Sequence, residues 1–233
     1  MTRIAFAAAF LLSCTSFAEG VRGSGNAQRE TRAVGSFTGL SVSSGIRGEV
    51  KIGPQRVEIE ADDNVLPLVE TVVEDGTLMV RFKRHLFSLN TETPVVVRVS
   101  APSIDELDAS GGSSIRADVA SSDDLSIQSS GGGEVHVKHV AVKKLDAHVS
   151  GGGGLFLDGS ADQVKLALSG GARCMGGGFS THALRVQASG GSVAELAVSD
   201  SVQGRASGGS VIHVRGRPEL RVDSTGGSVV DSE

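Results

Sequence analysis

The sequence contains no Trp and no Tyr, and its eight Phe account for all of its 3% Phe, Trp and Tyr content. Proteins that bind single-stranded nucleic acid rely on aromatic side chains for base stacking, and on a basic surface for the phosphates. This chain has few aromatic residues and a net charge of −5. Both shortages argue against a nucleic-acid-binding protein, and the first also argues against a lectin that stacks sugars on aromatic rings.

Proline and long hydrophobic runs are also scarce. The chain has only five Pro beside 32 Gly, which is unlike collagen or a Pro-rich disordered segment. No segment after the amino terminus approaches the ~20 apolar residues that a membrane-spanning helix needs. Since 39% of the residues are hydrophobic, a core can form, but it must be built mainly from Val, Leu, Ile and Ala.

The amino terminus resembles an export signal. Residues 1–18 contain Arg3, a short apolar run and the small-x-small sequence Ser16-Phe17-Ala18, which is typical of a secretory signal peptide. The segment Leu11-Leu12-Ser13-Cys14 also resembles a bacterial lipobox, in which Cys14 is lipidated. Both interpretations predict an exported protein, located in the periplasm or at the outer membrane or cell surface.

Only Cys174 remains after cleavage at residue 18, so we expect no internal disulfide bond. Cys174 falls on an inward position of the pattern described below, which favours a buried structural thiol over a nucleophile. Residues 19–34 are polar and rich in Gly and Ser, and we interpret them as a flexible tether.

A glycine motif organises the rest of the chain. Ser-Gly-Gly occurs six times and Thr-Gly-Gly closes the series, at intervals of 18–20 residues, which is a repeat architecture. The predicted structural corners are Ser110, Gly111, Gly112, Ser130, Gly131, Ser150, Gly151, Ser169, Gly170, Ser189, Gly190, Ser207, Gly208, Thr225 and Gly226. Glycine suits a corner because it tolerates positive φ and allows close approach of another backbone.

Hydrophobic residues alternate with polar residues on both sides of each motif, as in Leu145, Ala147 and Val149 before Ser150. Alternation with period two predicts strands with one face turned inward. The repeats are too short for helical crossovers, and equivalent strands recur in the same sense one period later. The sequence therefore predicts an all-β fold, a parallel β-helix (β-solenoid) of about 20-residue coils.

Residues 106–233 form the regular coils in this prediction. Residues 35–105 lack the motif, but they are rich in expected strands, and Asp75-Gly76 has the composition of a hairpin turn. Val65–Val73 is interpreted as a short helix or turn. We expect residues 35–105 to form irregular amino-terminal coils that cap the same solenoid, so that residues 35–233 are one domain.

Several motifs in order carry a resemblance to a known family. They are the start Gly35–Val42, the segment Val57–Ile59, the turn Asp75–Leu78, the strand Val95–Val99 with Ala101-Pro102, and the Ser-Gly-Gly coils. The chain is similar to the bacterial envelope family of putative auto-transporter adhesins with a head GIN domain. The resemblance implies a right-handed β-helix, an adhesin or cell-surface role, and no catalytic residues.

Candidate catalytic and metal-binding groups are sparse. Asp105, Glu106 and Asp108 are close in sequence, as are Asp123 and Asp124, but the short uniform coils lack the long loops that build a glycosidase groove. The six His are not spaced as a ligand set with Cys or carboxylates. We therefore expect no catalytic residue, no metal and no cofactor.

Four cations stand four or two residues before a corner and should share one outer face: Lys165, Arg185, Arg205 and Arg221. We interpret them as a stripe that could bind acidic glycan or lipid headgroups, with an ordinary solvated face as the alternative. Separately, the last coil ends at Val229–Val230 without a capping helix, which leaves strand edges that could self-associate unless Asp231 and Glu233 prevent it.

The sequence thus predicts a non-catalytic exported β-solenoid of the cell envelope, an adhesin-like module whose partner is an envelope glycan or another protein. A self-associating periplasmic scaffold, as a homo-oligomer, is one alternative. A polysaccharide-active enzyme is the other.

Overall fold

The computed structural model describes residues 20–83, 89–118 and 122–233. The predicted signal peptide and Cys14 lie outside the described residues. The described chain consists mainly of strands. They are β1 (Val21–Arg22), β2 (Ala27–Arg32), β3 (Gly39–Val42), β4 (Arg47–Ile52), β5 (Arg56–Asp62), β6 (Val69–Glu74), β7 (Thr77–Phe82), β8 (Leu89–Asn90), β9 (Val96–Ala101), β10 (Glu106–Ala109), β11 (Ser114–Asp118), β12 (Ser122–Ser129), β13 (Glu134–Val149), β14 (Gly154–Leu168), β15 (Arg173–Ala188), β16 (Val193–Ala206), β17 (Val211–Arg215), β18 (Glu219–Ser224) and β19 (Val229–Ser232).

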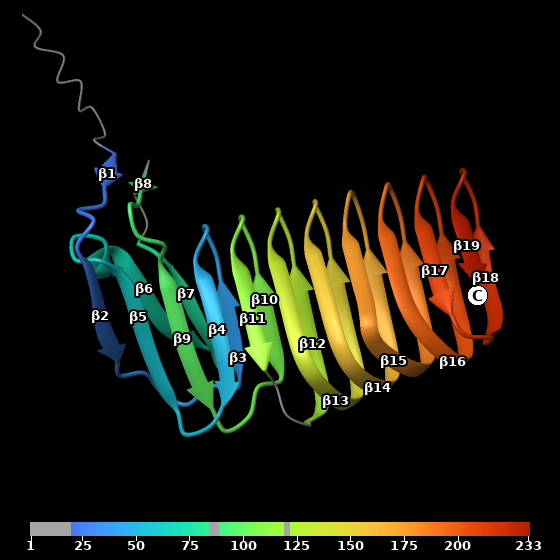
Figure 1. Ribbon diagram of the computed structural model, residues 1–233, viewed down its shortest axis with the longest axis horizontal. Helices are drawn as coiled ribbons and strands as arrows, with labels where there is room; N and C mark the ends of the chain where they lie inside the picture. Colours follow the sequence, from blue (N-terminus) through green and yellow to red (C-terminus); the bar gives the residue numbers. More distant parts are fainter. Residues whose placement is uncertain (1–19, 84–88, 119–121) are drawn as a thin grey trace, which may run out of the picture.

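Successive coils stack along one axis, each with a narrow tip at its Ser-Gly-Gly corner and a broad bend at the other end (Figure 1). The pairing is parallel and in register, for example Leu145 of β13 with Val164 of β14, and Val164 with Leu184 of β15. The predicted all-β parallel solenoid is confirmed.

Each coil contributes to two outer faces. We call face A the surface formed by strands that end at a corner, such as β10, the end of β13 and β18. Face B is formed by strands that begin after a corner, such as β11, the start of β13 and β19. The long strands β13 to β16 cross the broad bend and so belong to both faces.

The corners are tight turns that stack on one another. In the corner after β10, Gly111 and Gly112 have φ of 59° and 74°, and the Ser113 amide donates to the Ser110 carbonyl oxygen. Two successive residues with positive φ form a type I′ turn, a conformation that glycine adopts at no steric cost. At Ser169, Ser189 and Ser207 only the first glycine has positive φ.

Alternate residues of every coil fill the interior. Leu145, Ala147 and Val149 are at most 1% exposed, and Cys174 is fully buried. Phe179, at the broad bend of β15, is 1% exposed and is the largest fully buried residue in the described structure. The core is therefore a packed aliphatic column, because the predicted inward positions of neighbouring coils lie directly over one another.

The amino-terminal coils are stacked out of sequence order. β3 and β4 are joined by a corner at Ser43-Ser44-Gly45, where Ser44 has φ of 62° in the place of the first glycine. This coil lies between β7 and β9 on one side and β10 and β11 on the other. The sequence motif did not identify this corner, because Ser stands where the other corners have Gly.

The predicted tether is wrong for residues 27–32. They form β2, which pairs antiparallel with β5, as Glu30 with Ile59. β5 in turn pairs antiparallel with β9, so β2 is the outermost strand of face B at the amino-terminal end. Residues 21–22 also form a strand, β1, beside β8.

The ambiguous segment at residues 65–73 contains both a helical turn and a strand. A 3₁₀ helix spans Leu66–Leu68, with Pro67 near its start, and β6 follows directly. The predicted hairpin turn at Asp75-Gly76 is confirmed, because β6 and β7 pair antiparallel with Glu74 opposite Thr77.

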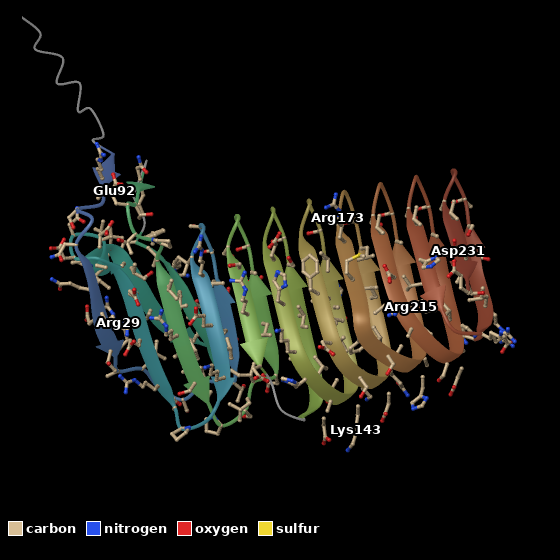
Figure 2. The ribbon with its side chains drawn as sticks, in the orientation of Figure 1. Arg29, Glu92, Lys143, Arg173, Arg215 and Asp231 are labelled. Atoms are coloured by element: carbon tan, nitrogen blue, oxygen red, sulfur yellow. The ribbon has the colours of Figure 1, made fainter. Side chains whose placement is uncertain are left out.

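The last coil is held partly by a histidine. His213 of β17 lies 2.5 Å from Asp231 of β19 (Figure 2 labels Asp231), and its second ring nitrogen lies 3.8 Å from Glu233. The hydrogen bond to Asp231 raises the pKa of His213 above its usual value, with smaller contributions from Glu233 and Glu195.

A raised folded-state pKa means that this pair stabilises the fold below the unfolded pKa of about 6.5, and that the contribution disappears as pH rises through the higher folded value. We expect His213→Gln to lower the urea midpoint at about pH 6 and to have little effect at about pH 9. Urea titrations of both proteins at the two pH values measure this. A deficit that is equal at both pH values would contradict the ionic role of His213.

Candidate functional site

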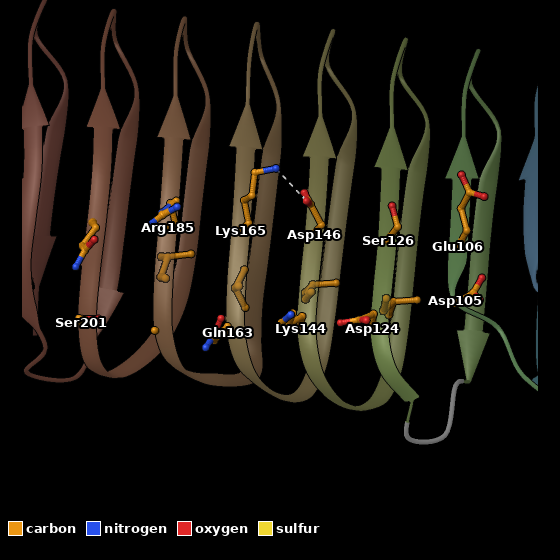
Figure 3. Close-up of a pocket in the computed structure, with 16 residues that line it drawn as sticks. Asp105, Glu106, Asp124, Ser126, Lys144, Asp146, Gln163, Lys165, Arg185 and Ser201 are labelled. Carbon is orange, nitrogen blue, oxygen red and sulfur yellow. Dashed lines mark hydrogen bonds and ion pairs between the residues drawn. The ribbon is translucent and has the colours of Figure 1, made fainter.

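Face A carries a shallow groove made of two adjoining hollows of about 900 and 750 Å³. Arg185 and Gln203 line both hollows. The larger hollow extends from Asp105 and Glu106, before the first Ser-Gly-Gly corner, to Ser201 and Gln203 of β16 (Figure 3). The smaller hollow lies closer to the corners and includes the corner residues Ser150, Ser169, Ser189 and Ser207.

The register of the strands places the groove side chains in rows along the solenoid axis. One row contains, in order, Glu106, Ser126, Asp146, Lys165, Arg185, Gln203 and Arg221. The next row towards the corners contains Asp108, Gln128, His148, Ala167, Gln187, Arg205 and Asp223. Each coil contributes one outward-pointing side chain to each row.

The four cations of the predicted stripe all lie on face A, but they do not form one continuous row. Lys165 and Arg185 are register neighbours, Gln203 separates Arg185 from Arg221, and Arg205 belongs to the row nearer the corners. The predicted stripe is therefore a cluster of three cations, Lys165, Arg185 and Arg205, and Arg221 lies apart from them in the last coil.

Three of these four cations have an acidic neighbour. Lys165 donates to Asp146 at 3.0 Å, Arg205 lies 3.9 Å from Asp223, and Arg221 lies 2.6 Å from Glu219. Arg185 has no ion pair within the described part of the chain. It is therefore the cation of the stripe that is available to an outside anion.

Charge is unevenly distributed along the larger hollow. The acids Asp105, Glu106, Asp124 and Asp146 belong to its amino-terminal coils, and Lys165 and Arg185 lie towards the carboxyl-terminal coils, among Gln163, Ser201 and Gln203 (Figure 3). Sequence reasoning missed the contributions of Lys144, His148 and the glutamines. The signal for them was their spacing from the corners: Lys144 and Gln163 lie in the row two residues before that of Lys165 and Arg185, and His148 and Gln187 lie in the row two residues after it.

Three of the five candidate acids of the enzyme interpretation are each held by a neighbour. Asp108 accepts a hydrogen bond from Ser41 at 2.8 Å, and burial raises the pKa of its carboxyl group. Glu106 accepts from Thr77 at 2.7 Å. Asp123 pairs with Lys143 at 2.8 Å near the broad bend (Figure 2 labels Lys143), which lowers the pKa of Asp123.

A third hollow of about 350 Å³ at the broad bend contains His182 and Ser199. The sequence alone identified no Ser-His-Asp set, and the structure brings these two residues close to Asp200. However, Ser199 donates to Asp200 at 2.5 Å, and the imidazole Nδ1 is 3.0 Å from Ser199 and 3.8 Å from Asp200. In a hydrolase triad the carboxylate hydrogen-bonds to the histidine, and the histidine accepts a hydrogen bond from the serine hydroxyl. Here the Ser199 hydroxyl donates to Asp200 instead, so His182 does not activate Ser199.

Other reactive groups give no site in the described residues. No group of three or more His, Cys, Asp and Glu residues there is arranged to hold a metal ion, and His85 lies outside them. Burial raises the pKa of the Cys174 thiol to about 12, so it is not a thiolate nucleophile. Within the described ranges, no helix has the length and apolar character needed to cross a membrane.

Comparison with known proteins gives a family and a fold. The family model described as "Putative auto-transporter adhesin, head GIN domain" matches residues 36–218. None of the curated proteins matches the chain. Among solved structures, a putative adhesin from Bacteroides fragilis is 18% identical with a TM-score of 0.83, and the match covers 92% of this chain and 100% of that one.

Two further structures from Parabacteroides share the fold. A putative lipid binding protein from P. distasonis is 16% identical with a TM-score of 0.74, covering 92% of this chain and 100% of that one. A putative adhesin from P. merdae is 18% identical with a TM-score of 0.64, covering 92% and 99%. At these identities the likeness describes the architecture alone.

Proposed function

We propose, from the premise that this chain belongs to the family of putative auto-transporter adhesins with a head GIN domain, that it is a non-catalytic, exported binding module of the cell envelope. Its ligand lies in the groove of face A and is a linear polymer that carries hydroxyl and carboxylate groups. The signal-like residues 1–18 support export, and Cys14 would supply a lipid anchor.

The shape of the groove favours an extended ligand. Its larger hollow is open and spans the coils from Glu106 to Gln203. Since neighbouring parallel strands lie ~4.8 Å apart, five steps between six coils amount to about 24 Å. Small-molecule sites are usually enclosed, whereas this groove is open to solvent.

The chemistry of the groove favours an anionic, hydroxylated ligand. The observation that carries the proposal is Arg185, a guanidinium that lines both hollows and has no ion pair in the described structure. Arginine binds carboxylate groups with two parallel hydrogen bonds. The adjacent Gln163, Gln187 and Gln203 offer amides that can donate to and accept from sugar hydroxyls.

A single lipid tail is a poorer occupant. The interior of the coils is filled by side chains such as Leu166 and Val186, both at most 1% exposed, so an acyl chain has no apolar cavity there. The putative lipid binding protein from P. distasonis makes anionic lipid headgroups the competing ligand class, because they share the same charge.

Binding to polygalacturonate, a linear carboxylated polysaccharide, tests the proposal at low ionic strength. We expect Arg185→Gln to weaken binding about five-fold, since one exposed ionic contact contributes up to about 1 kcal/mol. Arg173→Gln is the matched control, because Arg173 is an exposed arginine on face B without an ion pair among the described residues (Figure 2). The polymer should also keep its viscosity during incubation.

Several results would oppose the proposal. Equal losses for Arg185→Gln and Arg173→Gln would mean nonspecific charge attraction, and falling viscosity would indicate an enzyme. Binding to vesicles of phosphatidylglycerol and phosphatidylcholine, in the absence of binding to polygalacturonate, would show that the groove selects lipid headgroups instead.

A further inference from the structure

Charge on face A changes from coil to coil. A third outward row, two residues before that of Lys165 and Arg185, contains Asp124, Lys144, Gln163, Ala183, Ser201 and Glu219. In the three rows together, the ends of β14, β15 and β16 each carry one cation and no acid: Lys165, Arg185 and Arg205. The remaining row positions of these coils hold only Gln, Ser and Ala. We call these three consecutive coils the cationic block.

Acids lie on the amino-terminal side of the cationic block. β10 contributes Glu106 to the rows and β12 contributes Asp124, and neither strand contributes a cation (Figure 3). On β13, which lies between β12 and the block, Lys144 is offset by Asp146. The groove therefore changes from negative through neutral to positive between β10 and β14.

An acid also borders the block on its carboxyl-terminal side. β18 contributes Glu219, Arg221 and Asp223 to the rows, and Arg221 is paired with Glu219 at 2.6 Å. Asp223 lies 3.9 Å from Arg205. The block thus has Asp146 beside Lys165 at one edge and Asp223 beside Arg205 at the other.

The two edge pairs are open to exchange with a ligand. The side chains of Lys165 and Asp146 are 55% and 45% exposed, and those of Arg205 and Asp223 are 83% and 82% exposed. Ion pairs this exposed contribute little to stability, so a ligand carboxylate can replace either acid at its cation. Arg185, in the middle coil, has no acid to displace within the described residues.

We propose that the cationic block limits the acidic part of the ligand to three consecutive anionic sugar residues, one over each coil. The inference rests on the proposed function. Neighbouring coils are ~4.8 Å apart, which is close to the rise of one sugar residue in an extended chain. A fourth carboxylate would lie over the neutral β13, and further ones over Asp124 and Glu106, where Coulomb repulsion opposes binding.

The acidic coils still contribute to binding when the sugar above them is uncharged. Carboxylate oxygens such as those of Glu106 and Asp124 accept hydrogen bonds from hydroxyl groups. The groove therefore favours a polymer with short acidic stretches between neutral residues over a polymer that is charged along its whole length.

Oligogalacturonates of two, three and six residues test this limit by titration calorimetry at low ionic strength. We expect Kd to fall about five-fold from two residues to three, because the third carboxylate gains one exposed ionic contact. The oligomer of six residues should bind no more tightly than that of three, once its larger number of binding registers is taken into account.

A double variant removes the repulsion and should raise affinity. Glu106→Gln with Asp124→Asn should tighten binding of the six-residue oligomer about five-fold and leave binding of the three-residue oligomer unchanged. Glu49→Gln with Glu134→Gln is the matched control, because it removes the same charge from two exposed acids of face B. The control should bind both oligomers as the unmodified protein does.

A Kd that falls steadily from two to six residues in the unmodified protein would overturn the inference and leave the proposed function intact. An equal gain for the two double variants would also overturn it, since affinity would then follow total charge. Failure of every oligomer to bind would contradict the proposed function, and the inference with it.

Discussion

Gly133→Ala is expected to lower the free energy of unfolding by about 3 kcal/mol. Gly133 is the third residue after Ser130 and ends the corner at which the chain passes from face A to face B, just before β13 begins at Glu134. A Cβ atom at this position would lie 2.2 Å from the carbonyl oxygen of Ala109 and 2.7 Å from its carbonyl carbon. Both atoms belong to the backbone of a neighbouring strand, so no side-chain rotation can relieve the overlap.

A second corner glycine provides the control. Gly171 also follows a corner serine, but a Cβ there meets nothing within 4 Å, and its φ is not positive. Gly171→Ala should change stability by less than about 1 kcal/mol. Urea denaturation of the two variants measures the difference, and equal stabilities would show that the corners are not closely packed.

Phe179→Ala is expected to cost about 3–5 kcal/mol, which is typical of removing a fully buried phenylalanine. The ring lies at the broad bend and is 1% exposed. Its loss leaves a cavity between coils that neighbouring aliphatic side chains can fill only in part, because both backbones are fixed by the parallel ladder.

Phe156→Ala tests the same substitution on the outer surface of face B. Phe156 stacks on His136 with ring centroids 4.3 Å apart and an angle of 6° between the planes. We expect a loss of about 1 kcal/mol from this half-exposed pair. Guanidinium unfolding monitored by circular dichroism orders the two variants. If Phe156→Ala were the more destabilising, the stability would reside in the surface stacks and not in the core.

Much of the regular fold could be predicted because two signals agreed. The alternation around Ser150, with Leu145, Ala147 and Val149 turned inward, predicts strands. The nearly constant spacing of the glycine motif predicts the coils. Both follow from local backbone geometry, which a sequence expresses directly.

The amino-terminal coils could not be ordered in the same way. Ser44 adopts positive φ without glycine, and alternation along β3 and β4 does not tell which coil packs against them. The polar sequence of β2 reads as a linker because an edge strand that resists aggregation has the same composition. Stacking order and edge position are tertiary properties, and no local pattern records them.

The candidate site was predicted in outline. Counting back from the corners placed Lys165, Arg185 and Arg205 on one face, as the register shows. The hollows themselves depend on short side chains, such as Ala167 and Ala183, beside longer ones. A concave surface and the ion pair of Lys165 with Asp146 therefore required the three-dimensional structure.

The stacked corners make the length of the molecule proportional to its number of coils. Each coil packs only against its immediate neighbours, so removing or adding one repeat changes the length by a single strand spacing of ~4.8 Å and leaves both ends chemically the same. Gene duplication of one coil would thus lengthen the reach of the protein in fixed increments. Selection could match that reach to the distance it has to bridge without redesigning either terminus.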